Sequence, residues 1–269
     1  MIEVKDLAFS YDGEKEVLKD ISLRIEEASY IAIMGDNGAG KSTLVKHFNG
    51  LLRPTRGTVL VDGLDTSEET VSSLSRKVAL VFQYPESMFF SETVHDEMAF
   101  ALRNFGFNDK VVEDGVRKYL TLFGLRRYED RSPFTLSGGE QRRLALACVL
   151  TWGPKYVVLD EPTAGQDQLQ REILVGIVRQ LVTQGKTVVV VSHDVEFVAE
   201  TSPYVFLMAD GELVDQGEAQ PVLSNERSVE KAGLILPQVT AAFREVKGLS
   251  QNIVSTAQAA DEIFRLYGG

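Results

Sequence analysis

The stretch that decides the fold is Gly35-Asp36-Asn37-Gly38-Ala39-Gly40-Lys41-Ser42, which Thr43 follows. It fits the pattern G-x-x-x-x-G-K-[ST] at every fixed position. Glycines in such a loop let successive backbone N–H groups converge on phosphate oxygens, and the start of the following helix adds positive potential. Lys41 is placed to reach the outer phosphates, and the hydroxyl of Ser42 is placed to bind Mg²⁺. The stretch predicts a phosphate-binding loop between a strand and a helix.

Short apolar runs around this loop predict a parallel sheet. Each run is continuously apolar rather than alternating, as in strands that are buried on both faces. The runs cover residues 30–34, 156–159 and 187–191. Helical patterns lie between them, such as residues 94–105, where apolar side chains recur on one face. Alternating residues 7–11, and residues 58–61 before an Asp62-Gly63 turn, predict an antiparallel β region beside this α/β core.

The second buried run ends in two acids, Asp160 and Glu161. Ligands of open parallel sheets bind at the carboxyl ends of the strands, so these carboxylates should lie beside the phosphate loop. A carboxylate in the place of Asp160 binds Mg²⁺ in phosphoryl-transfer enzymes. Glu161 is then placed to face the attacking water.

Composition limits the classes of function. The chain has 269 residues, of which 44% are hydrophobic and 25% charged, with a formal net charge of −11. Such an acidic surface repels polyanions, which argues against direct contact with nucleic acid and with anionic lipid. Cys148 is the only cysteine, so no internal disulfide forms and a reducing cytoplasm fits. Because no secretory signal or membrane-spanning run is present, we expect a membrane role to depend on a protein partner and not on lipid insertion.

From about residue 220 the pattern changes, and we expect two regions, 1–220 and 221–269. The second region carries equal numbers of basic and acidic residues, and it shows two helical patterns. In the first, Pro237 stands at the first helical position and Lys247-Gly248 at the stop, with one apolar face made by Val239, Ala242, Phe243 and Val246. In the second, Ser255 and Gln258 have capping-box spacing before the apolar stripe Ala260, Ile263, Phe264 and Tyr267.

A further motif, Leu136-Ser137-Gly138-Gly139-Glu140-Gln141, lies between the phosphate loop and the acidic strand. A serine and two glycines before a helix make a second anion cradle. Here the sequence resembles the ATP-binding-cassette (ABC) family, whose signature is LSGGQ or LSGGE. The resemblance implies a P-loop nucleotide-binding domain with a RecA-like parallel sheet, an antiparallel β subdomain and a helical signature subdomain. It also implies that two such domains pack head to tail and hold ATP between the phosphate loop of one and the signature of the other.

The resemblance implies roles for further single residues. Gln83 matches the glutamine expected near Mg²⁺ and at the joint with a membrane partner, and His193 matches the switch histidine that contacts the γ-phosphate. Tyr11 matches the aromatic residue that stacks on adenine. Asp167 matches the aspartate of the D-loop, although Gln166 replaces the leucine that usually precedes it. With Lys41 and Glu161, these residues form the expected ATPase site.

One branch of the family is more similar still. Phe82-Gln83-Tyr84-Pro85-Glu86, Phe89, Phe90 and Glu92-Thr93-Val94 resemble the ATPases of energy-coupling-factor (ECF) transporters, as does the tail segment Gly233-Leu234-Ile235-Leu236-Pro237-Gln238-Val239. This implies an ATPase on the cytoplasmic face of the membrane that powers the import of vitamins or transition-metal ions. A second ATPase subunit, a transmembrane coupling subunit and a substrate-binding membrane subunit are the implied partners. The tail resembles a dimerisation module, and Met88-Phe89-Phe90 is a candidate for the groove that receives the transmembrane subunit, or a plain piece of core.

Two other functions stay open from the sequence. One is a non-transport ABC ATPase of DNA repair or translation, which the acidic charge disfavours. The other is a regulatory subunit with little hydrolysis, which the intact Glu161 and His193 disfavour.

Overall fold

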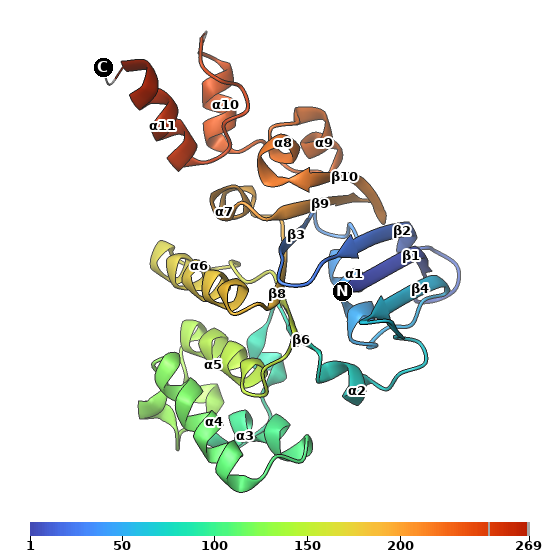
Figure 1. Ribbon diagram of the computed structural model, residues 1–269, viewed down its shortest axis with the longest axis vertical. Coiled ribbons are helices and arrows are strands. Elements are labelled where there is room, and N and C mark those ends of the chain that lie inside the picture. Colours follow the sequence, from blue (N-terminus) through green and yellow to red (C-terminus); the bar gives the residue numbers. More distant parts are fainter. Residues whose placement is uncertain (247, 268–269) are drawn as a thin grey trace.

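The computed structural model describes residues 1–246 and 248–267, which form two sheets and the helices around them (Figure 1). The strands are β1 (Ile2–Phe9), β2 (Leu18–Ile25), β3 (Tyr30–Met34), β4 (Arg56–Val61), β5 (Leu64–Asp65), β6 (Val78–Val81), β7 (Tyr156–Asp160), β8 (Thr187–Ser192), β9 (Tyr204–Ala209) and β10 (Glu212–Glu218). The α-helices are α1 (Lys41–Phe48), α2 (Val71–Ser75), α3 (Val94–Asn104), α4 (Asp109–Leu122), α5 (Gly138–Leu150), α6 (Gln168–Thr183), α7 (Val195–Thr201), α8 (Ala219–Leu223), α9 (Glu226–Lys231), α10 (Gln238–Arg244) and α11 (Thr256–Tyr267). Three short 3₁₀ helices are η1 (Pro85–Met88), η2 (Arg126–Tyr128) and η3 (Pro133–Thr135).

The larger sheet has the strand order β10-β9-β3-β8-β7-β6, and only β10 at its edge runs antiparallel to its neighbour. The three predicted strands are its central neighbours β3, β8 and β7, which confirms the parallel α/β core. Successive residues of β8 enter different cores: Val188 and Val190 pack with α5 and α6, whereas Val189 and Val191 pack with α1 and the antiparallel sheet. Burial on both faces explains why these runs are continuously apolar.

The smaller sheet is antiparallel, with the order β2-β1-β4-β5, which confirms the predicted antiparallel region. It lies to one side of the parallel sheet, and α3, α4 and α5 lie together at one end of the molecule (Figure 1). Thr93 caps the start of helix α3, because its side chain accepts a hydrogen bond from the Asp96 N–H, and the helix buries Val94, Met98 and Leu102. The fold is therefore the one that the resemblance implies, with a parallel core, an antiparallel region and a helical region that carries the signature.

The tail helices pack into two hydrophobic clusters. Helices α8 and α9 bury Val222, Leu223 and Val229 in the main core. Only α10 and α11 have a small cluster of their own, which contains Phe243, Ile253 and Ala259. In Figure 1 these two helices lie at the opposite end of the molecule from α3 to α5. Val254, between α10 and α11, also lies in the main core, so the predicted division into 1–220 and 221–269 stays a prediction.

The two predicted tail helices are present, with two differences in the first of them. Pro237 is the residue before α10 rather than its first residue, and Thr240 is buried in place of Ala242 and Val246, because its hydroxyl donates to the Ile253 carbonyl at 2.6 Å. The capping box before α11 is confirmed, since Ser255 and Gln258 exchange side-chain to backbone hydrogen bonds of 3.3 Å. Lys247 and the side chain of Tyr267 lie outside what the structure describes.

The described part of the chain contains no helix that is long and apolar enough to span a bilayer.

Candidate functional site

The phosphate loop lies between β3 and α1, as predicted. Two of its positions, 35 and 40, have no room for a side chain. Gly35 has φ 151°, and a Cβ there would lie 2.2 Å from the carbonyl oxygen of Met208. Gly40 has φ 95°, and a Cβ there would lie 2.8 Å from a methyl group of Leu18. Other residues would collide with the sheet at both positions, because a contact under 3.0 Å forces displacement. The loop shape thus depends on these glycines.

Lys41 is buried at the base of the loop, with only 6% of its surface exposed. Its ammonium donates to the carbonyls of Gly35 at 2.9 Å and Asp36 at 3.0 Å. Burial lowers the pKa of Lys41, while the carboxylates of Glu161, Asp160 and Asp36 oppose that change. The charged ammonium therefore faces the interior of the loop, where phosphate oxygens would replace carbonyls as its partners.

Ser42 and Asp160 meet across the ends of α1 and β7. The Ser42 hydroxyl donates to Asp160 Oδ1 at 3.0 Å. Asp160 is buried, which raises its pKa, and the hydrogen bond from Ser42 opposes this change. A hydroxyl and a carboxylate that share one site fit Mg²⁺, which keeps several water or phosphate ligands and takes few from protein.

Glu161 and His193 form the other half of the site. Glu161 follows β7 with φ 47°, a left-handed conformation that its N–H stabilises by donating to the Val191 carbonyl at 2.8 Å. Nδ1 of His193 lies 3.0 Å from Oε1 and 2.9 Å from Oε2 of Glu161. Glu161 is 6% exposed, whereas the His193 side chain is 49% exposed. The buried carboxylate and the solvent-facing imidazole thus contact each other at the sheet edge. The ammonium of Lys41 lies 3.9 Å from Oε1 of Glu161.

Gln83 lines the same small cavity as Asp160 and Glu161. Gln166 lines this cavity from the side of the D-loop, and its side-chain oxygen is buried with no hydrogen-bond partner among the described residues. A leucine would bury no polar atom there. The departure from the family pattern thus places an unpaired amide oxygen between the acidic strand and α5.

The signature lies at the start of α5 with Ser137 and Gly138 exposed to solvent. In this state, Glu140 occupies the cradle itself, since its Oε2 accepts from the Ser137 N–H at 2.9 Å and from the Ser137 hydroxyl at 2.8 Å. Its other oxygen accepts from the Tyr128 hydroxyl. These bonds lower the pKa of Glu140 to about 2, with the Tyr128 bond as the largest cause. Sequence patterns gave no indication of Tyr128, because it lies in η2.

The remaining predicted residues, Tyr11 and Asp167, lie at the edge of the candidate site. Tyr11 is 62% exposed, its hydroxyl is 3.2 Å from that of Thr43 in α1, and its ring contacts Phe9 edge to face at 4.8 Å. Asp167 is exposed and accepts from the Gln170 N–H at 2.8 Å, which caps α6. One turn later, Arg171 pairs with Asp194 at 2.8 Å, beside His193, a link between the D-loop helix and the switch segment that the sequence analysis missed.

The aromatic run after Gln83 divides between core and surface. Phe89 is 7% exposed and packs in the main core, whereas Phe90 is 59% exposed and contacts Phe100 edge to face at 4.5 Å. Tyr84 and Phe134 are also more than half exposed. We call Tyr84, Phe90, Phe100 and Phe134 the aromatic surface; they come from both sides of η1, from α3 and from η3.

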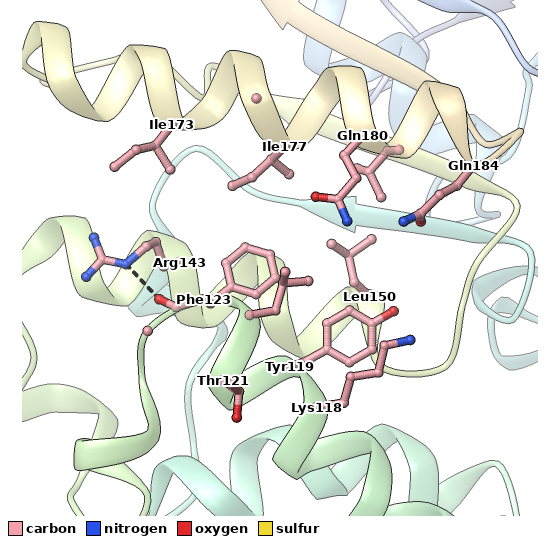
Figure 2. Close-up of a pocket in the computed structure, with 14 residues that line it drawn as sticks. Lys118, Tyr119, Thr121, Phe123, Arg143, Leu150, Ile173, Ile177, Gln180 and Gln184 are labelled. Atoms are coloured by element: carbon pink, nitrogen blue, oxygen red, sulfur yellow. Dashed lines mark hydrogen bonds between the residues drawn. The ribbon is translucent and has the colours of Figure 1, made fainter.

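A further cavity lies elsewhere, between α4 and α6 (Figure 2). It measures about 770 Å³, and its walls are mostly apolar, with Phe123, Leu150 and Ile177 facing one another. Figure 2 shows Lys118, Gln180 and Gln184 at one end of it. Neither the phosphate loop nor the signature lines it. The cavity is therefore separate from the candidate site.

The comparisons with known proteins agree with this geometry. The sequence pattern of the ABC transporter family matches residues 18–164, so the chain belongs to the ABC transporter family. A putative ABC transporter ATP-binding protein of Pyrococcus furiosus is 49% identical over 81% of this chain and 84% of its own length. An energy-coupling factor transporter ATP-binding protein of Clostridium perfringens is 39% identical over 94% of this chain and 92% of its own length.

Solved structures extend the similarity. The structure of cbiO1 from Clostridium perfringens, part of the ABC transporter complex cbiONQ, has a TM-score of 0.77 and 31% identity, over 91% of this chain and 98% of that one. A dimeric ATP-binding cassette in a post-hydrolysis state with ADP and Pi has a TM-score of 0.74 and 28% identity, over 81% of this chain and 99% of that one. The predicted ABC ATPase, and the resemblance to ECF transporter ATPases, are confirmed.

Proposed function

We propose that this chain is the ATP-hydrolysing subunit of an ECF-type importer of vitamins or transition-metal ions, and that it works on the cytoplasmic face of the membrane. The similarity to an ECF ATPase over 94% of the chain, tail included, supports this assignment. The aromatic surface beside Gln83 is the single observation that favours a transporter subunit over a free-standing ATPase. Phe90 and Phe100 contact each other within it, and exposed apolar patches are typical of protein interaction sites.

In the hydrolysis mechanism that this geometry supports, each residue has a separate task. Lys41 and the loop N–H groups bind the phosphates, and His193, which is half-exposed, can donate to the transferring group. Glu161 polarises the attacking water, because its buried carboxylate lies at the sheet edge between these two side chains. Tyr11 offers its exposed ring for stacking on adenine.

Mg²⁺ fits the polar groups at the ends of α1 and β7. Ser42 and Asp160 would hold it, with Gln83 from the same cavity. When bound, the ion supplies charge neutralisation to the phosphate oxygens. The hydroxyl and carboxylate are already in contact, so little rearrangement is needed to bind it.

Two chains are needed for a complete site in this proposal. The solvent exposure of Ser137 and Gly138 supports it, because a cradle that faces solvent can receive the phosphates bound by a second subunit. The exposed side chains of Ile263 (47%) and Phe264 (73%) on α11 support a second contact, in which the tail holds the pair together. The second subunit is a copy of this chain or a close paralogue.

Co-purification with the membrane subunits tests the transporter assignment. The variant Phe90→Asp places a charge in the aromatic surface and should release the transmembrane subunit while ATP binding stays at the wild-type level. The control is Val71→Asp, since Val71 is 41% exposed on α2, outside the aromatic surface. Equal recovery of the transmembrane subunit with both variants would contradict docking at this surface.

A further inference from the structure

The segment after α9 makes direct contact with the nucleotide loop. Helix α9 ends with the Gly233 N–H donating to the Glu230 carbonyl at 2.9 Å and the Leu234 N–H donating to the Val229 carbonyl at 3.0 Å. These two hydrogen bonds, together with the left-handed conformation of Gly233 (φ 70°), form a Schellman motif. It turns the chain sharply beside Asp36, so that Ala232 and Gly233 face the phosphate loop.

Ala232 fixes one peptide group of that loop. Its carbonyl accepts a hydrogen bond of 2.9 Å from the Asp36 N–H. The same peptide group carries the Gly35 carbonyl, which accepts from the Lys41 ammonium at 2.9 Å. Because a trans peptide is planar, its N–H and C=O point in opposite directions and cannot turn independently. The orientation of the Gly35–Asp36 peptide is therefore held by the tail on one side and by Lys41 on the other.

Gly233 leaves no space for adjustment at this contact. A Cβ on Gly233 would lie 2.7 Å from the Cβ and 3.2 Å from a carboxylate oxygen of Asp36. The segment cannot easily retreat, because Ala232 is 1% and Leu234 is 9% exposed in the main core. Farther along, the Gln238 N–H donates to Glu196 at 2.7 Å. A larger residue at position 233 must therefore displace Asp36 rather than the tail.

We propose that Ala232 and Gly233 are positioning residues of the ATP site, which set the Gly35–Asp36 peptide and through it the starting position of Lys41. When phosphate draws Lys41 away, Ala232 keeps the peptide from rotating, so that the loop meets the nucleotide already shaped. This inference depends on the ATP site and not on the proposed partners or cargo. A failure of the transporter assignment therefore leaves it testable.

The test is the dissociation constant of ATP for the full-length variant Gly233→Ala. Displacement of Asp36 should weaken binding roughly tenfold, an effect on the order of one lost hydrogen bond. The matched control is Gly185→Ala, because Gly185 also ends a helix in a Schellman motif, with φ 77°, and a Cβ there meets nothing within 4 Å. It carries the same backbone strain and should bind ATP as the wild type does. Equal ATP affinity of the two variants would overturn the proposal.

Rescue separates positioning from general destabilisation. Adding Asp36→Gly to Gly233→Ala removes the atom that collides, and should return the ATP affinity to that of Asp36→Gly alone within about twofold. Adding Asp36→Ala keeps the Cβ and should not rescue. Equal rescue by Asp36→Gly and Asp36→Ala would show that the contact between positions 36 and 233 is not the cause of the weaker ATP binding.

Two further measurements complete the test. Sedimentation of Gly233→Ala should match the wild type, since α10 and α11 are untouched, which separates this effect from dimerisation. If Gly233→Ala does not fold, hydrogen exchange of the wild type tests the proposal instead. The Asp36 amide should exchange slowly in the nucleotide-free protein, because it donates to the Ala232 carbonyl. Rapid exchange at Asp36 would contradict the bond to Ala232.

Discussion

The substitution Glu161→Gln tests the assignment of the residue that activates water. The amide has nearly the shape of the carboxylate but accepts no proton, so the hydrolysis step loses its base while the site keeps its packing. General-base assistance contributes about 10² to 10⁴ in rate, which corresponds to about 3 to 5 kcal/mol of the activation barrier. ATP should bind at least as tightly as before, because the variant removes a negative charge that lies 3.9 Å from Lys41 and competes with the phosphates for it.

Two assays separate these effects. The first measures ATP affinity at equilibrium and the second steady-state phosphate release, each with Glu68→Gln as a control at an exposed carboxyl of the antiparallel region. We expect Glu161→Gln to retain ATP binding and to release phosphate at least a hundredfold more slowly. Phosphate release near the wild-type rate would refute the role of Glu161, and a loss of ATP binding would show that the carboxylate supports the site rather than the reaction.

Three further outcomes follow from the same contacts. Lys41→Ala should weaken ATP binding by about 2 to 3 kcal/mol, measured by equilibrium titration, because it removes a charged donor to the phosphates. Phe264→Asp should shift the nucleotide-free protein toward monomer in sedimentation, by about 3 to 5 kcal/mol if the side chain is buried between subunits, while Val71→Asp stays as the wild type. The ionised form of Glu140 stabilises the fold above its ordinary pKa, and this contribution should disappear as the pH falls from 4.5 to about 2. The Tm difference between the wild type and Tyr128→Phe should therefore shrink over that range, and a constant difference would contradict the hydrogen bond as the cause of the low pKa.

Much of the site could be predicted from the sequence because strand ends determine it. Buried parallel strands are continuously apolar, and their carboxyl ends meet at one edge of the sheet. Asp160, Glu161 and His193 follow such runs at once or within two residues, and Lys41 follows another run after the phosphate loop, so the topology of the sheet brings these side chains together. Side-chain contacts of 3.0 Å join Ser42 to Asp160 and His193 to Glu161.

Other features leave no pattern in the sequence. The bond between Asp36 and Ala232 joins two backbone groups, so no side-chain type records it. The apolar residues of α8 and α9 look the same whether they pack on the sheet or in a separate tail, so the charge balance alone suggested a boundary at residue 220. The division between Phe89 and Phe90 depends on the turn of η1, which periodicity does not reveal.

Mixed dimers provide the most direct test of the central claim, that two chains share each ATP site. With Ser137→Arg in one chain and Lys41→Ala in the other, both lesions fall in one shared site and the second site stays intact. With both substitutions in the same chain, each shared site carries one lesion. The account predicts that the first arrangement keeps ATP hydrolysis at one site and the second loses it, and equal phosphate release from the two arrangements would contradict it.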